Sequence, residues 1–329
     1  MAKSENQKQK LLYIIKCLME NTDSSHAITT PELIAYLNDK GIKAERKSIY
    51  NDIATLNEFG FDIIRSDEHR GGYMLASRDF ELAEVKLLVD LVQASKFITE
   101  KKSRELISKL ETLVSKNDAK ALHGQVEVIG RNKTINETIY YTVDIIHSAI
   151  SKNVKFRFQY YEWDVNKQLV PRRNGEFYEV SPWKLTWNDE NYYLVAYDEK
   201  VDDIRHYRVD KMRNVSLSEE VRAGKERFEN KSLAEYDKQT FSMFSGEKRT
   251  VRLLCEKDIL GVLIDRFGSD VSMRPAENGR GMAHMDVQVS SQFFGWLAGL
   301  GNKVRIVAPE DVVTEYKKYL ESILCLYNE

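Results

Sequence analysis

The chain has 329 residues, a length that suits about two or three domains rather than one. Apolar residues make up 42% of it, charged residues make up 30%, and the formal net charge is −2. Such a chain is not a polycation. Any contact with nucleic acid must therefore come from a local patch of basic residues.

Three cysteines, Cys17, Cys255 and Cys325, are far apart in the sequence and lie in apolar stretches. This pattern argues against a disulfide framework and favours a reducing compartment. The segment Met1–Lys10 is polar, unlike a signal peptide, and no apolar run approaches the roughly 18 residues that a membrane span needs. We therefore expect a cytoplasmic protein that does not bind membranes.

The first 78 residues have the pattern of a winged helix. Helices are expected at Gln7–Glu20, from a Thr30 cap to Gly41, and from about Glu45 to Glu58. The alternating segments Phe61–Arg65 and Tyr73–Leu75, joined by a glycine-containing turn, predict a β-hairpin. Three helices followed by a hairpin outline a winged helix-turn-helix.

The third of these helices is the expected recognition helix, which places side chains from its N-terminal turns against bases in the major groove. Its inner stripe is Ile49, Ile53 and Leu56. The predicted DNA-binding residues are Thr30, Arg46, Lys47, Ser48, Tyr50, Asn51, Thr55 and, at the wing tip, Arg70. The alternative for Arg46 and Lys47 is that they only solvate the end of a helix.

Residues 79–135 are expected to form a helical linker with a dimer contact, since apolar residues recur at helical spacing from Glu81 to Leu122. Near Ile139 a helix begins, and the period then changes to two. Strands are expected at Val154–Tyr161, Phe177–Val180, Tyr192–Tyr197 and Arg205–Val209. This order predicts a helix followed by a small, strongly curved sheet or barrel over residues 136–222.

Residues 223–246 are polar and mixed, and are expected to be a linker. Residues 247–329 then follow the order strand, helix, strand, strand, helix, strand, helix, which suggests an α+β domain of the ferredoxin-like type. The predicted fold is therefore a multidomain α+β protein.

Two segments carry family resemblances. The helix at Arg46–Ile53 resembles the Ser-x-Arg-Thr-Ile-Tyr-Arg-Asp-Ile pattern of bacterial helix-turn-helix regulators, although Ala44 stands at a frequent capping position and Asn51 replaces a frequent Arg. The second resemblance is carried by the segments Ser181–Leu185, Asn191–Tyr197 and Arg205–Met212, which in that order resemble the WYL domain family. Tyr192 replaces the Trp of the family name.

The WYL resemblance implies an Sm-like β-barrel that binds a ligand, often nucleic acid or a nucleotide, in a homodimer. It also implies a winged helix before the barrel and a ferredoxin-like extension after it. The residues expected to bind the ligand are Tyr160, Ser181 (before a turn), Tyr193, Arg205, His206 and Arg208. The alternatives are core packing for the tyrosines, a surface or packed position for His206, and a salt bridge with Asp210 for Arg208. Tyr178 stands where many relatives carry Arg, which leaves the ligand class open.

We therefore expect a bacterial transcription regulator that binds a duplex DNA operator and responds to a ligand, possible effectors being a nucleotide or single-stranded nucleic acid. The ligand would change the placement of the two winged helices in a dimer. The rival interpretation is a module that binds RNA or single strands and no duplex operator. The sequence carries no P-loop, nucleophile elbow or zinc-protease motif, and its six histidines are scattered, so we expect no enzyme, no cofactor and no metal site.

Overall fold

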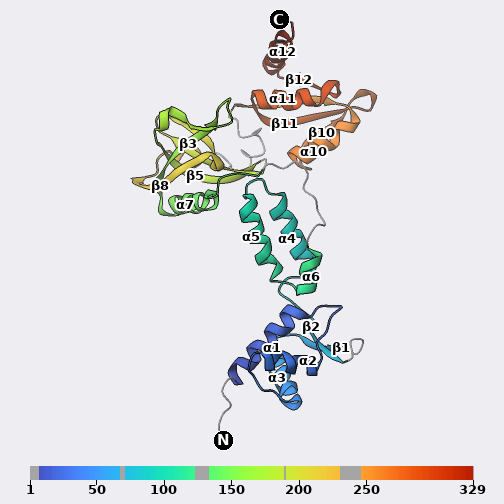
Figure 1. Cartoon of the computed structure of the whole chain (residues 1–329). Helices are drawn as coiled ribbons and strands as arrows, with labels where there is room; N and C mark the ends of the chain where they lie inside the picture. Colours follow the sequence, from blue (N-terminus) through green and yellow to red (C-terminus); the bar gives the residue numbers. More distant parts are fainter. Residues whose placement is uncertain (1–6, 67–70, 123–132, 189, 230–245, 329) are drawn as a thin grey trace. The chain divides into compact units, whose positions relative to one another are not determined.

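A computed structural model describes residues 7–66, 71–122, 133–188, 190–229 and 246–328 (Figure 1). The chain divides into two compact units, Met1–Glu137 and Thr138–Glu329. In the described ranges, no helix is long and apolar enough to cross a membrane. The mixed helix-and-sheet, multidomain architecture predicted from the sequence is confirmed. The division into five segments stays a prediction.

The first unit begins with three helices and a hairpin, as predicted. Their bounds are α1 (Gln7–Asn21), α2 (Thr30–Asp39), α3 (Arg46–Phe59), β1 (Ile63–Ser66) and β2 (Gly72–Leu75). The first two helices and α3 bury one apolar core, which includes Ile14, Leu33 and Ile49. Backbone hydrogen bonds in both directions between Ile28 and Tyr73 tie the α1–α2 loop to the hairpin. The predicted Thr30 cap is wrong by one residue, because Thr29 has the extended backbone of an N-cap and Thr30 begins α2.

Three shorter helices complete this unit. They are α4 (Leu82–Ala94), α5 (Glu100–Glu111) and α6 (Lys116–Ala121). Val85 and Val89 of α4 pack with Val114 and Leu122 in a second small core. The helical character predicted for this segment is therefore confirmed, and the segment is divided into three helices.

Polar contacts join α1 to the start of α6. Asp23, which follows α1 and is buried, accepts a hydrogen bond from the Ser115 hydroxyl at 2.6 Å and contacts the His26 ring at 2.7 Å. Arg78 donates to the backbone oxygens of Met19 and Thr22 at 2.8 and 2.6 Å. These bonds fix the end of α1 against the segment that follows the hairpin.

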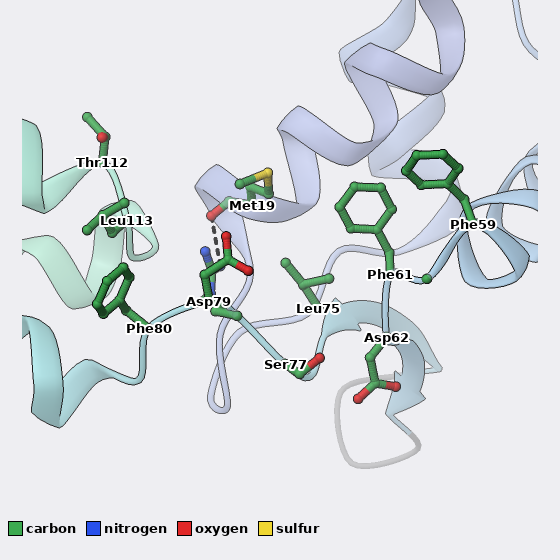
Figure 2. A pocket seen from close by; sticks show the side chains of 12 residues that line it. Met19, Phe59, Phe61, Asp62, Leu75, Ser77, Asp79, Phe80, Thr112 and Leu113 are labelled. Atoms are coloured by element: carbon green, nitrogen blue, oxygen red, sulfur yellow. Dashed lines mark hydrogen bonds between the residues drawn. The ribbon is translucent and has the colours of Figure 1, made fainter.

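A cavity of about 310 Å³ lies beside this junction (Figure 2). Side chains from α1, the end of α3, the β2–α4 connection and the end of α5 line it, among them Met19, Phe61, Leu75, Phe80 and Leu113. It lies at the Phe59 end of α3, and Arg46 begins the opposite end of that helix. The cavity is thus separate from the predicted DNA-reading residues.

The second unit begins with α7 (Ile139–Lys152), which packs against a curled six-stranded sheet. The strands are β3 (Val154–Trp163), β4 (Leu169–Pro171), β5 (Tyr178–Asn188), β6 (Asn191–Asp198), β7 (Asp203–Arg208) and β8 (Met212–Val221). The central strand is β3, which pairs antiparallel with β4, β5 and β8. Two short 3-10 helices, η1 (Arg172–Gly175) and η2 (Val209–Lys211), and helix α8 (Glu226–Glu229) complete this part.

Two differences from the sequence-based prediction concern this sheet. The strands β4 and β8 were not predicted. The strand that was expected to end at Val180 continues through Ser181 and Pro182, where a turn had been expected, to Asn188. The strand continues because its register shifts between Pro182 and Lys184, and such a bulge accommodates a proline that cannot donate a ladder hydrogen bond.

The last part of the unit has the predicted element order. Its elements are β9 (Glu247–Cys255), α10 (Leu260–Phe267), β10 (Ser272–Pro275), β11 (Gly281–Val289), α11 (Ser291–Gly299), β12 (Val304–Ala308) and α12 (Glu310–Cys325). The strands form one antiparallel sheet in the order β10-β11-β9-β12. Leu253, Leu263 and Phe293 are fully buried in the core between this sheet and its helices.

The Asp23 junction generates a pH-dependent prediction. Burial raises the pKa of the Asp23 carboxyl, but the hydrogen bonds from Ser115 and His26 lower it more, so the net pKa lies below its ordinary value. A carboxyl with a lowered folded-state pKa adds stability above its ordinary pKa, and this stability is lost as the pH falls through the folded-state pKa.

We expect Asp23→Asn to destabilise the first unit by about 1–3 kcal/mol at neutral pH and by less in acid, where the wild-type carboxyl is protonated. Hydrogen exchange of the α1 and α6 amides, measured at both pH values, checks this. The matched control is Asp79→Asn, because Asp79 is exposed. Equal loss of protection at both pH values would contradict the assigned ionisation.

Candidate functional site

The recognition-helix candidate α3 begins after Glu45 and ends at Gly60, whose φ of 117° terminates the helix. Ile49, Ile53 and Leu56 face the core, as predicted. The opposite side is left to Arg46, Lys47, Tyr50 and Asn51, which are all exposed. One helical face therefore offers two cations, a phenol and an amide to solvent.

Arg46 and Tyr50 are organised by each other. The Arg46 Nε donates to the Tyr50 hydroxyl, and the guanidinium carbon lies 5.8 Å from the centre of the Tyr50 ring. This hydrogen bond lowers the pKa of the Tyr50 hydroxyl. Because the phenol oxygen accepts from Arg46, its own proton is available to an external acceptor such as a phosphate oxygen or a base edge.

The hairpin adds a cation that the sequence-based analysis did not select. Arg65 of β1 is exposed and lies opposite Tyr73, whose ring centre is 6.5 Å from that of Tyr50. Its Nε donates to the Gly71 carbonyl at 3.1 Å, which holds the side chain along the hairpin. Arg46 and Arg65 thus flank one pair of tyrosines. The pairing of Arg65 with Tyr73 in the predicted hairpin is the sequence signal that could have identified it.

The remaining predicted DNA-binding residues are placed differently. Ser48 is half-buried and accepts a hydrogen bond from Lys10, so it faces α1 rather than the exposed side of α3. Thr30 is buried at the first residue of α2. Thr55 is exposed, and its hydroxyl donates to the Asn51 carbonyl at 3.0 Å. Arg70 lies outside the described residues.

Lys10 is a second residue near this site that the sequence-based analysis missed. Its ammonium is 2.6 Å from Asp52, and the two side chains are only 3% and 16% exposed. A buried cation is tolerated when it is paired and hydrogen-bonded, and Lys10 has both Asp52 and Ser48. The signal was its position, because Lys10 precedes Ile14 by four residues and shares its inward-facing side of α1.

In the second unit, an aromatic cluster fills the curled sheet. Phe158 stacks on Tyr178 with ring centres 5.4 Å apart and an interplanar angle of 9°. Tyr160 and Tyr207 pack edge-on against these rings at 5.2 to 6.1 Å. The Tyr207 hydroxyl donates to the buried carboxylate of Asp198 at 2.9 Å. Burial, and then Asp198, raise the pKa of Tyr207 far above its ordinary value.

Two predicted ligand residues, Tyr160 of β3 and Tyr193 of β6, lie next to Arg208 of β7. Burial raises the pKa of Tyr160 to about 12, and its hydroxyl accepts from the Arg208 backbone N–H at 3.1 Å. Tyr193 lies directly opposite Arg208 in the β6–β7 pair. The Arg208 guanidinium holds both Asp210 oxygens, at 3.0 and 2.8 Å, and Asn191 at 2.9 Å. The salt-bridge alternative for Arg208 is therefore what the structure shows.

Three segments of the chain match models of known protein families. Family models match the WYL domain at residues 141–217, the WCX domain at 247–324 and the D3 domain of FokI at 12–68. The chain therefore contains a WYL domain and a WCX domain. The WYL match spans helix α7 and the curled sheet, the WCX match spans β9 to α12, and the FokI match covers most of the three helices and the first strand of the hairpin.

Solved structures give weaker likenesses. Proteasome accessory factor B/C of Arthrobacter aurescens is 20% identical with a TM-score of 0.28, and the match covers 94% of this chain but 45% of that one. A CRISPR Cas-related protein is 13% identical with a TM-score of 0.38, covering 75% and 71%. No curated protein matched the chain.

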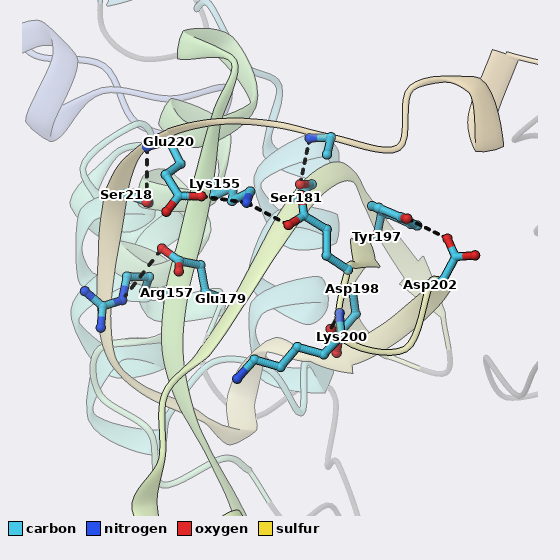
Figure 3. Close-up of polar contacts among 12 residues, drawn as sticks. Lys155, Arg157, Glu179, Ser181, Tyr197, Asp198, Lys200, Asp202, Ser218 and Glu220 are labelled. Atoms are coloured by element: carbon cyan, nitrogen blue, oxygen red, sulfur yellow. Dashed lines mark hydrogen bonds and ion pairs between the residues drawn. The ribbon is translucent and has the colours of Figure 1, made fainter.

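Within the WYL domain, the three other predicted ligand residues are Ser181, Arg205 and His206. Ser181 is fully buried, and its hydroxyl accepts from the Ala223 backbone N–H at 2.9 Å (Figure 3). This hydrogen bond joins the chain after β8 to β5, and a ligand contact of Ser181 stays a prediction. Arg205 is exposed opposite Ala196, and His206 is half-buried opposite Val195.

Several basic groups of the WYL domain are paired with acidic ones, namely Lys155, Arg157, Arg172 and Arg208. Lys155 lies between Glu199 and Glu220 at 3.0 and 2.7 Å, and Arg157 is 3.9 Å from Glu179 (Figure 3). The hydrogen bond to Glu220 contributes most to raising the pKa of Lys155 above its ordinary value. In the part of the chain that the structure describes, no cluster of His, Cys, Asp and Glu has the arrangement of a metal site.

The Lys10–Asp52 pair generates a test of how α3 is positioned. Lys10→Met would leave Asp52 charged and without its cation, so we expect the protection of the α3 amides from hydrogen exchange to fall by about a hundredfold. The double variant Lys10→Met/Asp52→Met removes both charges and should restore most of the protection. Unchanged α3 exchange in the single variant would contradict the structural importance of this pair.

Proposed function

We propose that the protein is a transcription regulator that binds duplex DNA through α3 and the hairpin. The observation that carries the proposal is the exposed face of Arg46, Lys47, Tyr50 and Asn51, with Arg65 of the hairpin beside it. A recognition helix needs hydrogen-bonding groups for base edges and cations for phosphates, and this face has both. The net charge of −2 makes such a local patch the source of affinity.

The WYL domain supplies the regulatory part of the proposal. We assign it to the Sm-like barrels and the WCX domain to the ferredoxin-like fold, which its β-α-β-β-α-β order supports. A nucleotide or a single-stranded nucleic acid bound at the WYL domain would change the affinity for the operator. Such a regulator would act in the cytoplasm and would need no enzymatic activity.

The alternative, a module for RNA or single strands without a duplex operator, makes an opposite prediction. It requires that purified protein select no duplex motif from genomic fragments. Recovery of a palindromic motif supports the regulator instead, because a dimer with two winged helices reads two half-sites related by symmetry.

The DNA-binding proposal is tested on a duplex recovered in that selection. We expect Arg46→Ala/Lys47→Ala to weaken binding at least tenfold and to reduce the slope of log affinity against log salt by about 2, because two phosphate-facing cations are lost. The matched control is Lys101→Ala/Arg104→Ala, which removes equal charge from exposed positions on α5. Titration by fluorescence anisotropy measures both. Equal losses in the two double variants would contradict a specific role for α3.

We further propose that α4 forms a homodimer contact. Leu87 and Leu91 lie one turn apart on α4 and are 61% and 58% exposed, whereas Val85 and Val89 are buried. The buried face of α4 packs within its own chain, so the exposed apolar face is available to a helix of a second copy of the protein.

We expect Leu87→Lys/Leu91→Lys to shift the protein toward the monomer and, through the loss of the second half-site contact, to weaken operator binding. Sedimentation velocity at several protein concentrations checks the first effect. The control is Leu12→Lys, which changes an exposed leucine of α1. A wild-type chain that is monomeric at all concentrations would contradict the proposal.

A further inference from the structure

The 3-10 helix η1, between β4 and β5, holds Arg173 in an unusual conformation. Arg173 has φ 51° and ψ 40°, and Asn174 follows with φ 53° and ψ 28°. The left-handed region costs a residue with a Cβ roughly 1–2 kcal/mol. Such outliers persist where the surroundings impose them, and they are enriched at functional sites.

The surroundings of η1 impose this turn. The Gln159 side chain of β3 donates to the Gly175 carbonyl and accepts from the Asn214 side chain of β8. Gly175 itself has φ 83°. Side chains of β3 and β8 therefore hold the end of the turn at Gly175. The sheet thus helps to fix the backbone around Arg173.

The strained turn places the Arg173 guanidinium on the aromatic cluster. Its carbon lies 4.3 Å from the centre of the Tyr178 ring, whose neighbours are Phe158, Tyr160 and Tyr207. The ring is buried, while Arg173 remains exposed. The cation is close enough to Tyr207 to lower its pKa, against the larger effects of burial and Asp198. Stacking fixes the plane of a guanidinium and leaves its N–H edge free to donate.

Among the described residues Arg173 has no acidic partner, whereas three other arginines of this unit have one. Arg172 in the same turn is 3.1 Å from Glu162, Arg208 is bound to Asp210, and Arg227 is 2.7 Å from Asp202. Among the described residues, no carboxylate lies within ion-pair distance of Arg173. A guanidinium that is stacked, oriented and uncompensated is a ready site for the two oxygens of an anionic group.

We propose that Arg173 binds a phosphate group of the ligand that the WYL domain recognises, with Tyr178 as its platform. The inference rests on the proposed regulatory function and adds a residue and a ligand chemistry to it. The phosphate could belong to a single-stranded oligonucleotide or to a free nucleotide. Bidentate contact with Arg173 is the shared chemistry.

The experiment uses the full chain and two probes, a fluorescein-labelled single-stranded oligodeoxynucleotide and ATP. Arg173→Gly is the main variant, because glycine adopts the left-handed backbone without strain and so removes the guanidinium while preserving the turn. We expect an unchanged or raised melting temperature and at least a tenfold loss of affinity for the probe that the wild type binds. Arg173→Lys should recover only part of the affinity, because lysine lacks the planar fork.

The matched control is Arg172→Ala, which removes the same charge from the same turn but from a residue paired with Glu162. Its affinity should fall far less than that of Arg173→Gly. The titrations with the oligonucleotide and with ATP identify the source of the phosphate. The probe that supplies it is the one whose affinity falls in Arg173→Gly. Equal losses in the two variants would overturn the proposal, as would a wild type that binds neither probe.

Duplex binding, measured on the same preparations, separates this proposal from the proposed function. Arg173→Gly should bind the unliganded operator as the wild type does, because α3 is unaltered. Intact operator binding without any Arg173-dependent phosphate binding would overturn only this inference. Loss of operator selection by the wild type would instead overturn the regulator assignment, and Arg173-dependent binding of the oligonucleotide would then favour the single-strand module.

Discussion

The alternation of side chains along β3 is the constraint on which the WYL domain depends. Phe156, Phe158 and Tyr160 point inward at every second residue, while Arg157 between them is exposed. Strand β3 pairs with three other strands, and its inward rings form one side of the aromatic cluster. The Gln159 side chain of the same strand holds the turn at Gly175. A shift of register by one residue would exchange these two sets and remove both core and loop support.

Charge pairing determines which basic groups of the protein remain available. The chain has 49 basic and 51 acidic residues, and many of the cations described above are held by carboxylates. Two exposed guanidiniums described above lie against aromatic rings instead. Arg46 on Tyr50 and Arg173 on Tyr178 share this arrangement, one in each unit. An aromatic partner orients the cation without neutralising it.

Local periodicity made much of the fold predictable, and pairing between distant segments limited the rest. The inward stripe Ile49, Ile53 and Leu56 could be identified from its spacing alone. The strands β4 and β8 were missed because β4 is short and β8 alternates in a largely polar segment, so each is stabilised by its pairing with β3. Ser48 was misplaced because its partner Lys10 is 38 residues away, and Ser181 because its partner Ala223 is 42 residues away. Arg173 depends on a left-handed turn that no helix or strand period encodes.

The contact between Asp23 and Ser115 joins groups that are 92 residues apart. During synthesis from the N-terminus, the winged helix is complete long before Ser115 is added to the chain. Until then the Asp23 carboxylate has no hydroxyl from α6, and the Glu20 side chain has no Lys116 to pair with. In the nascent protein, Glu20 and Asp23 at the end of α1 therefore remain without these two partners until Ser115 and Lys116 have been synthesised.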